Sequence, residues 1–135
     1  MWLNIIMGCG VLIVILTIWS LVHYFANPQL VSANGIGRAT GKCGDTMEIR
    51  LAINAGKVID VSHWTNGCAY SLTCVEAAAS LAKGKDVVKI QDINADSIRE
   101  RVGMPQNESA DCAMLAVSTL HAAVKDYLTT HADKA

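Results

Sequence analysis

The first part of the sequence lacks charged side chains. No Lys, Arg, Asp or Glu precedes Arg38, and the segment from Trp2 to Val22 is almost continuously apolar. About 20 apolar residues match the hydrocarbon thickness of a bilayer when they form one helix. We therefore expect residues 1–26 to form a transmembrane anchor and residues 27–41, rich in Gly and small polar residues, to form a linker.

A cleaved signal peptide is the alternative for this segment. Such a peptide carries a basic n-region, a shorter apolar core and a small-residue cleavage site. Here the n-region has no charged side chain and the apolar core is long, so the sequence favours an uncleaved anchor. Basic residues near a span favour the cytoplasmic side. Because Arg38 and Lys42 both follow the span, we expect a single-pass protein of the cell membrane with a cytoplasmic C-terminal domain.

The rest of the chain lacks the features of several functional classes. The 11 Lys and Arg nearly balance the 12 Asp and Glu, and aromatic residues make up only 5% of the sequence. Nucleic-acid binding needs a basic face, so no nucleic-acid partner is expected. The sequence also has no recognisable phosphate loop, Ser/His/Asp arrangement or paired-carboxylate setting. We therefore predict that the protein is not a classical enzyme.

Residues 42–130 have the pattern of one α+β domain, followed by a tail over residues 131–135. The segment "TMEIRLAI" alternates apolar and charged residues, which indicates a half-buried strand. The segment "NAGK" predicts a hairpin, and "VIDVSHWT" predicts a returning strand with a bulge or bend. Helical spacing follows in "YSLTCVEAAASLAKGK", where the expected apolar stripe is Leu72, Val75, Ala79 and Ala82. It also occurs over residues 97–102 and from Cys112 to about Leu128. Strands followed by helices predict a small antiparallel sheet with helices packed on one face.

The chain contains five cysteines, which are Cys9 in the apolar segment and Cys43, Cys68, Cys74 and Cys112 in the domain. A cytoplasmic domain is kept reduced, so metal binding or thiol chemistry is expected in place of disulfides. Cys43 lies in a Gly-flanked loop before a strand, whereas Cys68 and Cys112 lie at predicted helix starts. A helix N-terminus favours the thiolate form, which binds metals. Three such sulfurs can meet at one metal, with Asp45 or Asp111 as an oxygen ligand.

Each of these residues also has a simpler interpretation. The cysteines could be unrelated buried thiols, because free Cys packs like a small hydrophobic residue. Asp45 could close the turn before the strand, and Asp111 could cap the helix that begins at Cys112. Cys74 is expected to pack against the sheet, with a fourth sulfur ligand as the alternative. None of the four His residues has a partner at metal-ligand spacing.

Three of the cysteine contexts carry a family resemblance. "GKCGD" precedes the first strand, "NGC" precedes an Ala-rich helix that "KGK" closes, and "ADC" opens the last helix. Over residues 40–128 the chain resembles the NifU/IscU type of iron–sulfur cluster assembly scaffold. The resemblance implies Cys43, Cys68 and Cys112 as ligands of a labile [2Fe–2S] cluster or iron, and Asp45 as the carboxylate that keeps the site labile.

The resemblance also implies partners. A cysteine desulfurase would deliver sulfur as a persulfide, for which Cys112 is the predicted acceptor, and apo acceptor proteins would receive the cluster. Zn²⁺ is an alternative metal, because it accepts three thiolates and a carboxylate in a tetrahedron. The sequence leaves open whether the protein forms a homodimer.

The sequence departs from this family at several points. Asp111 stands where the family commonly has His, and "MPQNESAD" replaces a basic loop that a dedicated chaperone recognises. Cys74 is additional, and the apolar N-terminal segment is foreign to soluble members. These departures indicate a specialised member. They also support an alternative function as an accessory or structural subunit of a membrane redox complex, with a fixed metal or none.

Overall fold

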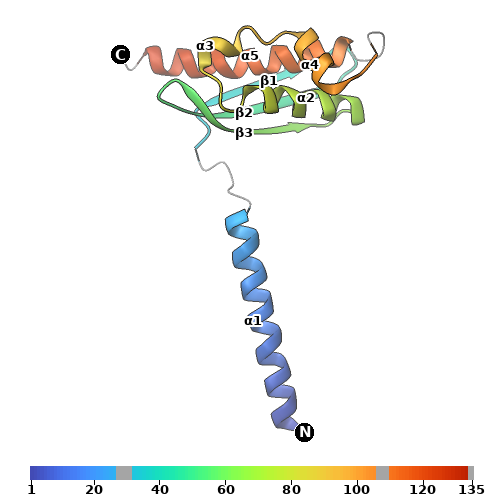
Figure 1. Ribbon diagram of the computed structural model, residues 1–135, viewed down its shortest axis with the longest axis vertical. Helices are drawn as coiled ribbons and strands as arrows, with labels where there is room; N and C mark the ends of the chain where they lie inside the picture. The colour runs from blue at the N-terminus through green and yellow to red at the C-terminus, as the bar shows by residue number, and fades with distance from the viewer. Residues whose placement is uncertain (27–31, 106–109, 134–135) are drawn as a thin grey trace. The chain divides into compact units, whose positions relative to one another are not determined.

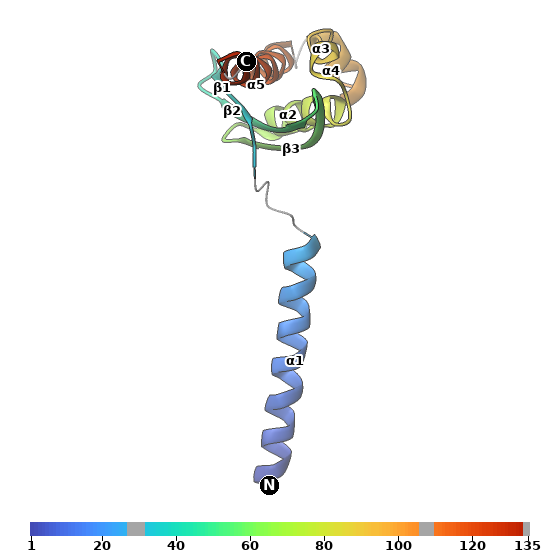
Figure 2. The ribbon, with the colours of Figure 1, turned by 90° about the vertical axis from the view of Figure 1, so that its left-hand side faces the viewer.

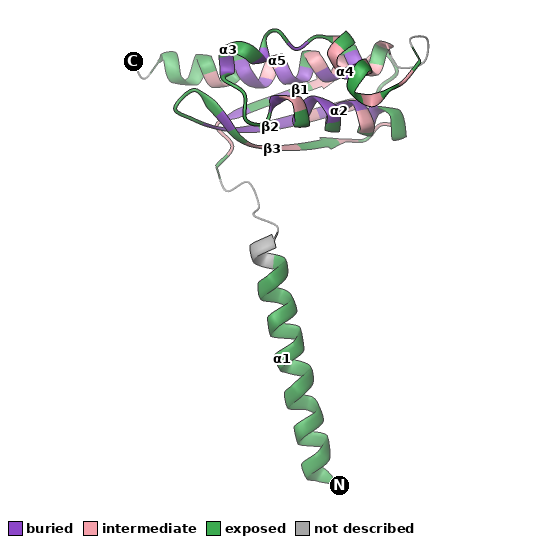
Figure 3. Ribbon diagram, viewed as in Figure 1, coloured by how far each residue is buried: buried purple, intermediate pink, exposed green. Residues whose placement is uncertain are grey.

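The computed structural model describes residues 1–26, 32–105 and 110–133, and it divides into two compact units, Met1–Val31 and Ser32–Ala135. In the first unit the described residues form helix α1 (Trp2–Ala26). Its side chains are exposed from Trp2 to His23 (Figure 3). By length and composition this stretch is able to cross a membrane.

The second unit is built on a three-stranded antiparallel sheet in the order β1–β2–β3. The strands are β1 (Gly35–Thr40), β2 (Thr46–Asn54) and β3 (Lys57–Thr65). The helices are α2 (Ala69–Ala82), α3 (Val87–Ile90), α4 (Ala95–Val102) and α5 (Ala110–Ala132). Figures 1 and 2 show α2 and α5 side by side on one face of the sheet, with α5 over β1 and α2 over β3. The predicted α+β architecture is confirmed.

The central strand β2 supplies the sheet's part of the core. Its alternate residues Met47, Ile49, Leu51 and Ile53 are buried, as their spacing predicts. The hairpin to β3 is also where the sequence places it. Ala55 and Gly56 take positive φ values of 51° and 75°, which suit the twist of a two-residue hairpin. The expected irregularity is a shift in the β2–β3 register between Ala52 and Ile53.

Small residues of α2 and larger aliphatic residues of the later helices complete the core. Each large aliphatic side chain buried in this way contributes about 1.5–3 kcal/mol to stability. The fully buried or nearly buried positions outside β2 include Val58, Val75, Ala78, Ala82, Ile90, Ile98, Leu120 and Val124. The predicted stripe of α2 was wrong at Leu72, which is 48% exposed, because the buried face of this helix runs through Ser71 and Cys74.

The predicted linker over residues 27–41 is wrong in its second half, because Gly35–Thr40 forms β1. Gly35 and Gly37 are buried beneath α5, where their lack of a side chain lets the helix backbone approach the strand. A Cβ at Gly37 would lie 2.1 Å from the Thr119 carbonyl oxygen. The glycines that suggested a linker are thus a helix-packing surface, and the compact unit begins at Ser32 in place of residue 42.

The last helix is longer at both ends than its apolar stripe predicts. Helix α5 begins at Ala110, two residues before Cys112, and continues to Ala132, so the predicted tail over residues 131–135 is largely helical where described. Asp111 is therefore in the first turn of α5 and not the residue before the helix, which was the position that the capping alternative required. Residues 106–109, which are half of the distinctive segment "MPQNESAD" (residues 104–111), lie outside the described residues.

Candidate metal centre

The predicted site residues come from three chain segments. Cys43 and Asp45 belong to the loop between β1 and β2, Cys68 is the residue that precedes α2, and Cys112 is in the first turn of α5. The first loop is closed by its own backbone, because the Gly41 N–H donates to the Asp45 carbonyl oxygen at 2.8 Å. The simpler interpretation, in which the Asp45 side chain closes this turn, is therefore not needed.

Polar side chains fix the corner that carries Cys68. The Thr46 N–H donates to Asn66 Oδ1 at 2.7 Å, and the Thr65 hydroxyl donates to the Thr46 carbonyl oxygen at 2.9 Å. The Gly67 N–H in turn donates to Thr65 Oγ1 at 3.1 Å. These bonds join the end of β3 to the start of β2, so Cys68 is held beside the loop that contains Asp45.

Three of the predicted donors converge on one hydroxyl, that of Ser71. Ser71 Oγ donates to Asp45 Oδ2 at 2.6 Å. The same oxygen lies 3.5 Å from Cys112 Sγ and 3.8 Å from Cys68 Sγ. Ser71 is completely buried and comes from α2, so this helix links the loop, its own N-terminus and α5. Sequence reasoning missed Ser71, although its spacing of three residues from Cys68 and from Cys74 places all three on one helix face.

A cleft of about 250 Å³ opens beside this cluster. Its lining comes from the β1–β2 loop and the first turns of α5, and includes Lys42, Cys43, Asp45, Asp111 and Cys112. Cys43 is exposed, whereas Cys112 is partly buried and packs against the core. The cleft thus brings the second oxygen candidate, the exposed Asp111, to the same opening as two of the cysteines.

The predicted donors lie near one another, but they do not form a complete metal-binding geometry. Among the residues that the structure describes, no three Cys, His, Asp or Glu side chains form a group that could hold a metal ion as they stand. The donor set nevertheless suits a soft metal, because it combines thiolates with one carboxylate at the end of a sheet. Cys43 is exposed on a loop that lines the cleft, outside any helix or strand, so a shift of this loop would bring its sulfur toward the other donors without disturbing the core.

The thiols of Cys68, which precedes α2, and of Cys74, inside α2, have opposite electrostatic settings. The backbone N–H of Ser71 and then that of Tyr70, both at the start of α2, lower the pKa of the exposed Cys68 thiol. This confirms for Cys68 the effect expected at a helix N-terminus. Burial raises the pKa of Cys74 to about 11, and the neighbouring Cys112 and Cys68 sulfurs add to the shift. Cys74 is 1% exposed, as expected for a packed thiol.

This difference predicts the order in which the two thiols react. At pH 7 a thiol with a pKa of about 11 is ionised in roughly one molecule in ten thousand. Iodoacetamide should therefore modify Cys68 in the folded protein and leave Cys74 unmodified until urea unfolds the chain. Peptide mass spectrometry after timed alkylation measures both rates. Equal rates for the two cysteines in the folded protein would contradict the assignment.

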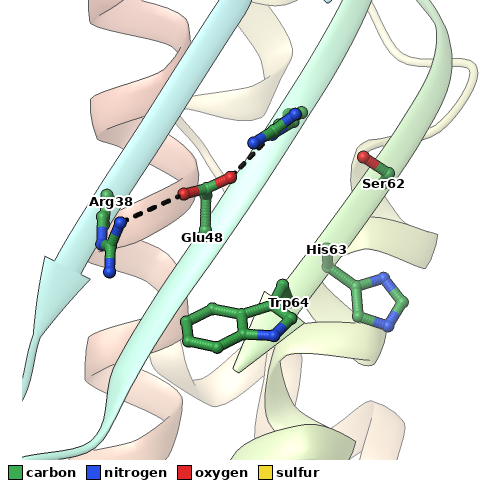
Figure 4. A pocket seen from close by; sticks show the side chains of 6 residues that line it. Arg38, Glu48, Ser62, His63 and Trp64 are labelled. Atoms are coloured by element: carbon green, nitrogen blue, oxygen red, sulfur yellow. Dashed lines mark hydrogen bonds and ion pairs between the residues drawn. The ribbon is translucent and has the colours of Figure 1, made fainter. Parts of the chain in front are cut away.

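A second cleft, of about 510 Å³, lies on the sheet face away from the helices (Figure 4). Glu48 accepts a hydrogen bond from Arg50 Nε at 2.6 Å and lies 3.7 Å from Arg38. The Arg38 guanidinium lies 5.8 Å from the centre of the Trp64 ring. The lining of this second cleft contains no cysteine, and its one carboxylate, Glu48, is paired with Arg38 and Arg50. This cleft is therefore not a candidate metal centre.

Comparison with known proteins decides the family. The sequence model described as the NifU-like N-terminal domain matches residues 22–134 of the chain. The chain belongs to the NifU-like N-terminal domain family. This match confirms the resemblance predicted from the three cysteine contexts, and it covers the sheet and all four helices of the second unit.

Relatives of this NifU-like chain carry names that refer to one process. The iron–sulfur cluster assembly scaffold protein IscU of Aquifex aeolicus is 30% identical over 114 residues, which cover 79% of the chain and 73% of the relative. The iron–sulfur cluster assembly protein 3 of Arabidopsis thaliana is 27% identical over 117 residues, which cover 80% and 68% of the two chains.

A solved structure shares the fold of the NifU-like chain. It is described as an iron–sulfur cluster assembly scaffold protein for the SUF system, from Fervidobacterium islandicum. The match has a TM-score of 0.58 at 18% identity and covers 70% of this chain and 82% of that one. At this level of identity the likeness shows the fold alone.

Proposed function

We propose that the protein is a membrane-tethered scaffold or carrier that assembles a [2Fe–2S] cluster on Cys43, Cys68 and Cys112 and passes it to acceptor proteins. The observation that carries this proposal is the convergence of Asp45, Cys68 and Cys112 on Ser71, beside the cleft that Cys43 lines. The names of the relatives support the same process. The cluster is cargo, so the residues must both hold it and release it.

The donor set suits a cargo that leaves. Clusters held by four thiolates are stable, whereas a carboxylate oxygen holds iron less tightly than a thiolate does. Asp45 would supply this weaker bond, and Asp111 is a further oxygen donor at the same cleft. Cys43 lies on an exposed loop, so one thiolate can leave the centre without disturbing the packed core.

Cys112 is the proposed acceptor of sulfur. Its thiolate would attack the outer sulfur of a persulfide on a cysteine desulfurase, so that a new S–S bond forms at Cys112 and the thiolate of the donor leaves. Reducing this sulfur to sulfide takes two electrons from an external thiol or electron-transfer protein. Cys112 suits the role because it lines the cleft while its helix is anchored in the core.

Helix α1 supplies the proposed tether. Its side chains from Trp2 to His23 are exposed, so an aqueous setting would leave a long apolar surface in water. A bilayer would cover that surface, and Arg38 and Lys42 on the following segment favour the cytoplasmic side for the domain. Clients at the membrane would then be reached without free diffusion of the scaffold.

Anaerobic reconstitution of the full chain in detergent tests the function. Iron, sulfide and thiol should produce the visible absorption and Mössbauer spectrum of a [2Fe–2S] cluster, and the cluster should move to an apo-ferredoxin. Zinc or no metal in the purified and reconstituted protein would favour the accessory-subunit alternative. A cluster that forms but never transfers would contradict the carrier role.

A further inference from the structure

Ser71 has a different setting from an ordinary helical serine. Hydroxyls inside helices usually bond to a backbone carbonyl one turn earlier or point to solvent. Thr73, on the same helix, behaves in this way and donates to the Ala69 carbonyl oxygen at 2.8 Å. Ser71 is fully buried, and its partner Asp45 is 26 residues away in the chain.

The hydroxyl can serve its three neighbours at once only in one arrangement. A serine hydroxyl has one proton to donate and two lone pairs to accept with. The short 2.6 Å contact with Asp45 Oδ2 takes the proton. The lone pairs then face the sulfurs of Cys112 and Cys68, at 3.5 Å and 3.8 Å. No described residue hydrogen-bonds to the other carboxylate oxygen, Asp45 Oδ1, which leaves it available to a metal.

The backbone is shaped to permit this contact. Gly67 lies against the pair, and a Cβ at this position would be 2.6 Å from Asp45 Oδ2 and 2.6 Å from Ser71 Oγ. A side chain at position 67 would therefore occupy the space in which the carboxylate and the hydroxyl meet. Glycine at this position and a buried hydroxyl one turn later are two separate features that serve the same contact.

We propose that Ser71 is a positioning residue of the metal centre, which holds Asp45 by Oδ2 so that Oδ1 faces the cargo and keeps the Cys68 and Cys112 sulfurs on either side. This inference rests on the proposed function and deepens it. Three donors are thereby gathered before cargo arrives, and Cys43 on its exposed loop completes the centre last. Hydrogen-bond partners of this kind typically change metal affinity by about 10–100-fold when they are removed.

The test uses the full chain in detergent with Zn²⁺ and Co²⁺ as probes. Ser71→Ala should weaken Zn²⁺ binding by about 10–100-fold in a competition titration. It should also change the visible spectrum of the Co²⁺ form, because the carboxylate is no longer held in place. Gly67→Ala keeps the hydroxyl but separates it from Asp45, so it should produce the same two changes. Thr73→Ala removes a hydroxyl from the same helix and should change neither.

Urea unfolding of each variant separates positioning from loss of fold, since affinities are compared only under conditions where every variant is folded. Unchanged Zn²⁺ affinity and Co²⁺ spectrum in Ser71→Ala, with wild-type protein binding both metals, would overturn the role of Ser71 alone. A change in Ser71→Ala without one in Gly67→Ala would overturn the proposed contact with Asp45. Failure of the wild-type protein to bind metal or cluster would overturn the proposed function itself.

Discussion

Replacing Gly37 with alanine is expected to lower the free energy of unfolding by about 3 kcal/mol, and it is the largest effect we predict on the fold. The added Cβ would lie 2.1 Å from the Thr119 carbonyl oxygen and 2.4 Å from the Ala123 nitrogen. Both atoms belong to the backbone of α5, which cannot rotate away as a side chain can. Strand and helix must therefore separate, and the small residues between them lose their contacts.

Urea unfolding followed by circular dichroism measures this cost. Gly44→Ala is the matched control, because nothing lies within 4 Å of its Cβ position and its φ of +85° adds only a backbone penalty. That penalty is about 1 kcal/mol. A Gly37→Ala protein no less stable than Gly44→Ala would show that α5 does not approach β1 so closely.

The largest effect on function is expected from Cys112→Ala, which should abolish cluster assembly. The change removes both a proposed ligand and the proposed sulfur acceptor, and it leaves Ser71 without one of the sulfurs that it contacts. The two roles are measured separately. Iron content and absorbance of the reconstituted protein test the role as ligand, and the mass of a persulfide adduct after incubation with a desulfurase tests the role as sulfur acceptor. A normal cluster yield would exclude Cys112 from the centre.

Cys74→Ala is the matched control for this experiment. It also removes one thiol next to the site, but this thiol is buried and has a raised pKa. The variant should assemble clusters at the wild-type level while losing about 1–2 kcal/mol of stability to the smaller side chain. If Cys74→Ala lost its cluster too, Cys74 would be a fourth sulfur ligand, which is the alternative that the sequence leaves open.

The fold was predictable where burial follows a simple period. In β2 the apolar residues alternate, and the strand is buried on one face as predicted. In β1 the buried positions are Gly35 and Gly37, which carry no apolar side chain, so the alternation is invisible to hydropathy. Leu72 is the opposite case. The apolar spacing of α2 predicts that Leu72 is buried, whereas the folded helix buries Ser71 in its place.

The cysteines of the candidate site could be predicted from the sequence. Their positions at a loop and two helix starts follow from local patterns, and the structure places Cys68 and Cys112 within 4 Å of one shared oxygen. The identity of that oxygen could not follow from apolar periodicity, because a buried serine breaks the pattern that defines a core face. The capping alternative for Asp111 assumed that the last helix begins at Cys112. Helix α5 begins at Ala110, before its first large apolar residue, so Asp111 is inside the helix.

Strand β1 also determines where a pull on the N-terminal segment would act. The strand receives that segment at Gly35 and pairs with β2 at every residue to Thr40, where the Cys43 loop begins. The Ile36 N–H donates further to Asp126 of α5 at 2.9 Å. Tension along β1 would load these bonds in parallel, in a shear geometry, before any strain reached the loop. In the proposed tethered form, a pull along β1 would thus be carried by the β1–β2 pairing before it reached the loop that holds Cys43.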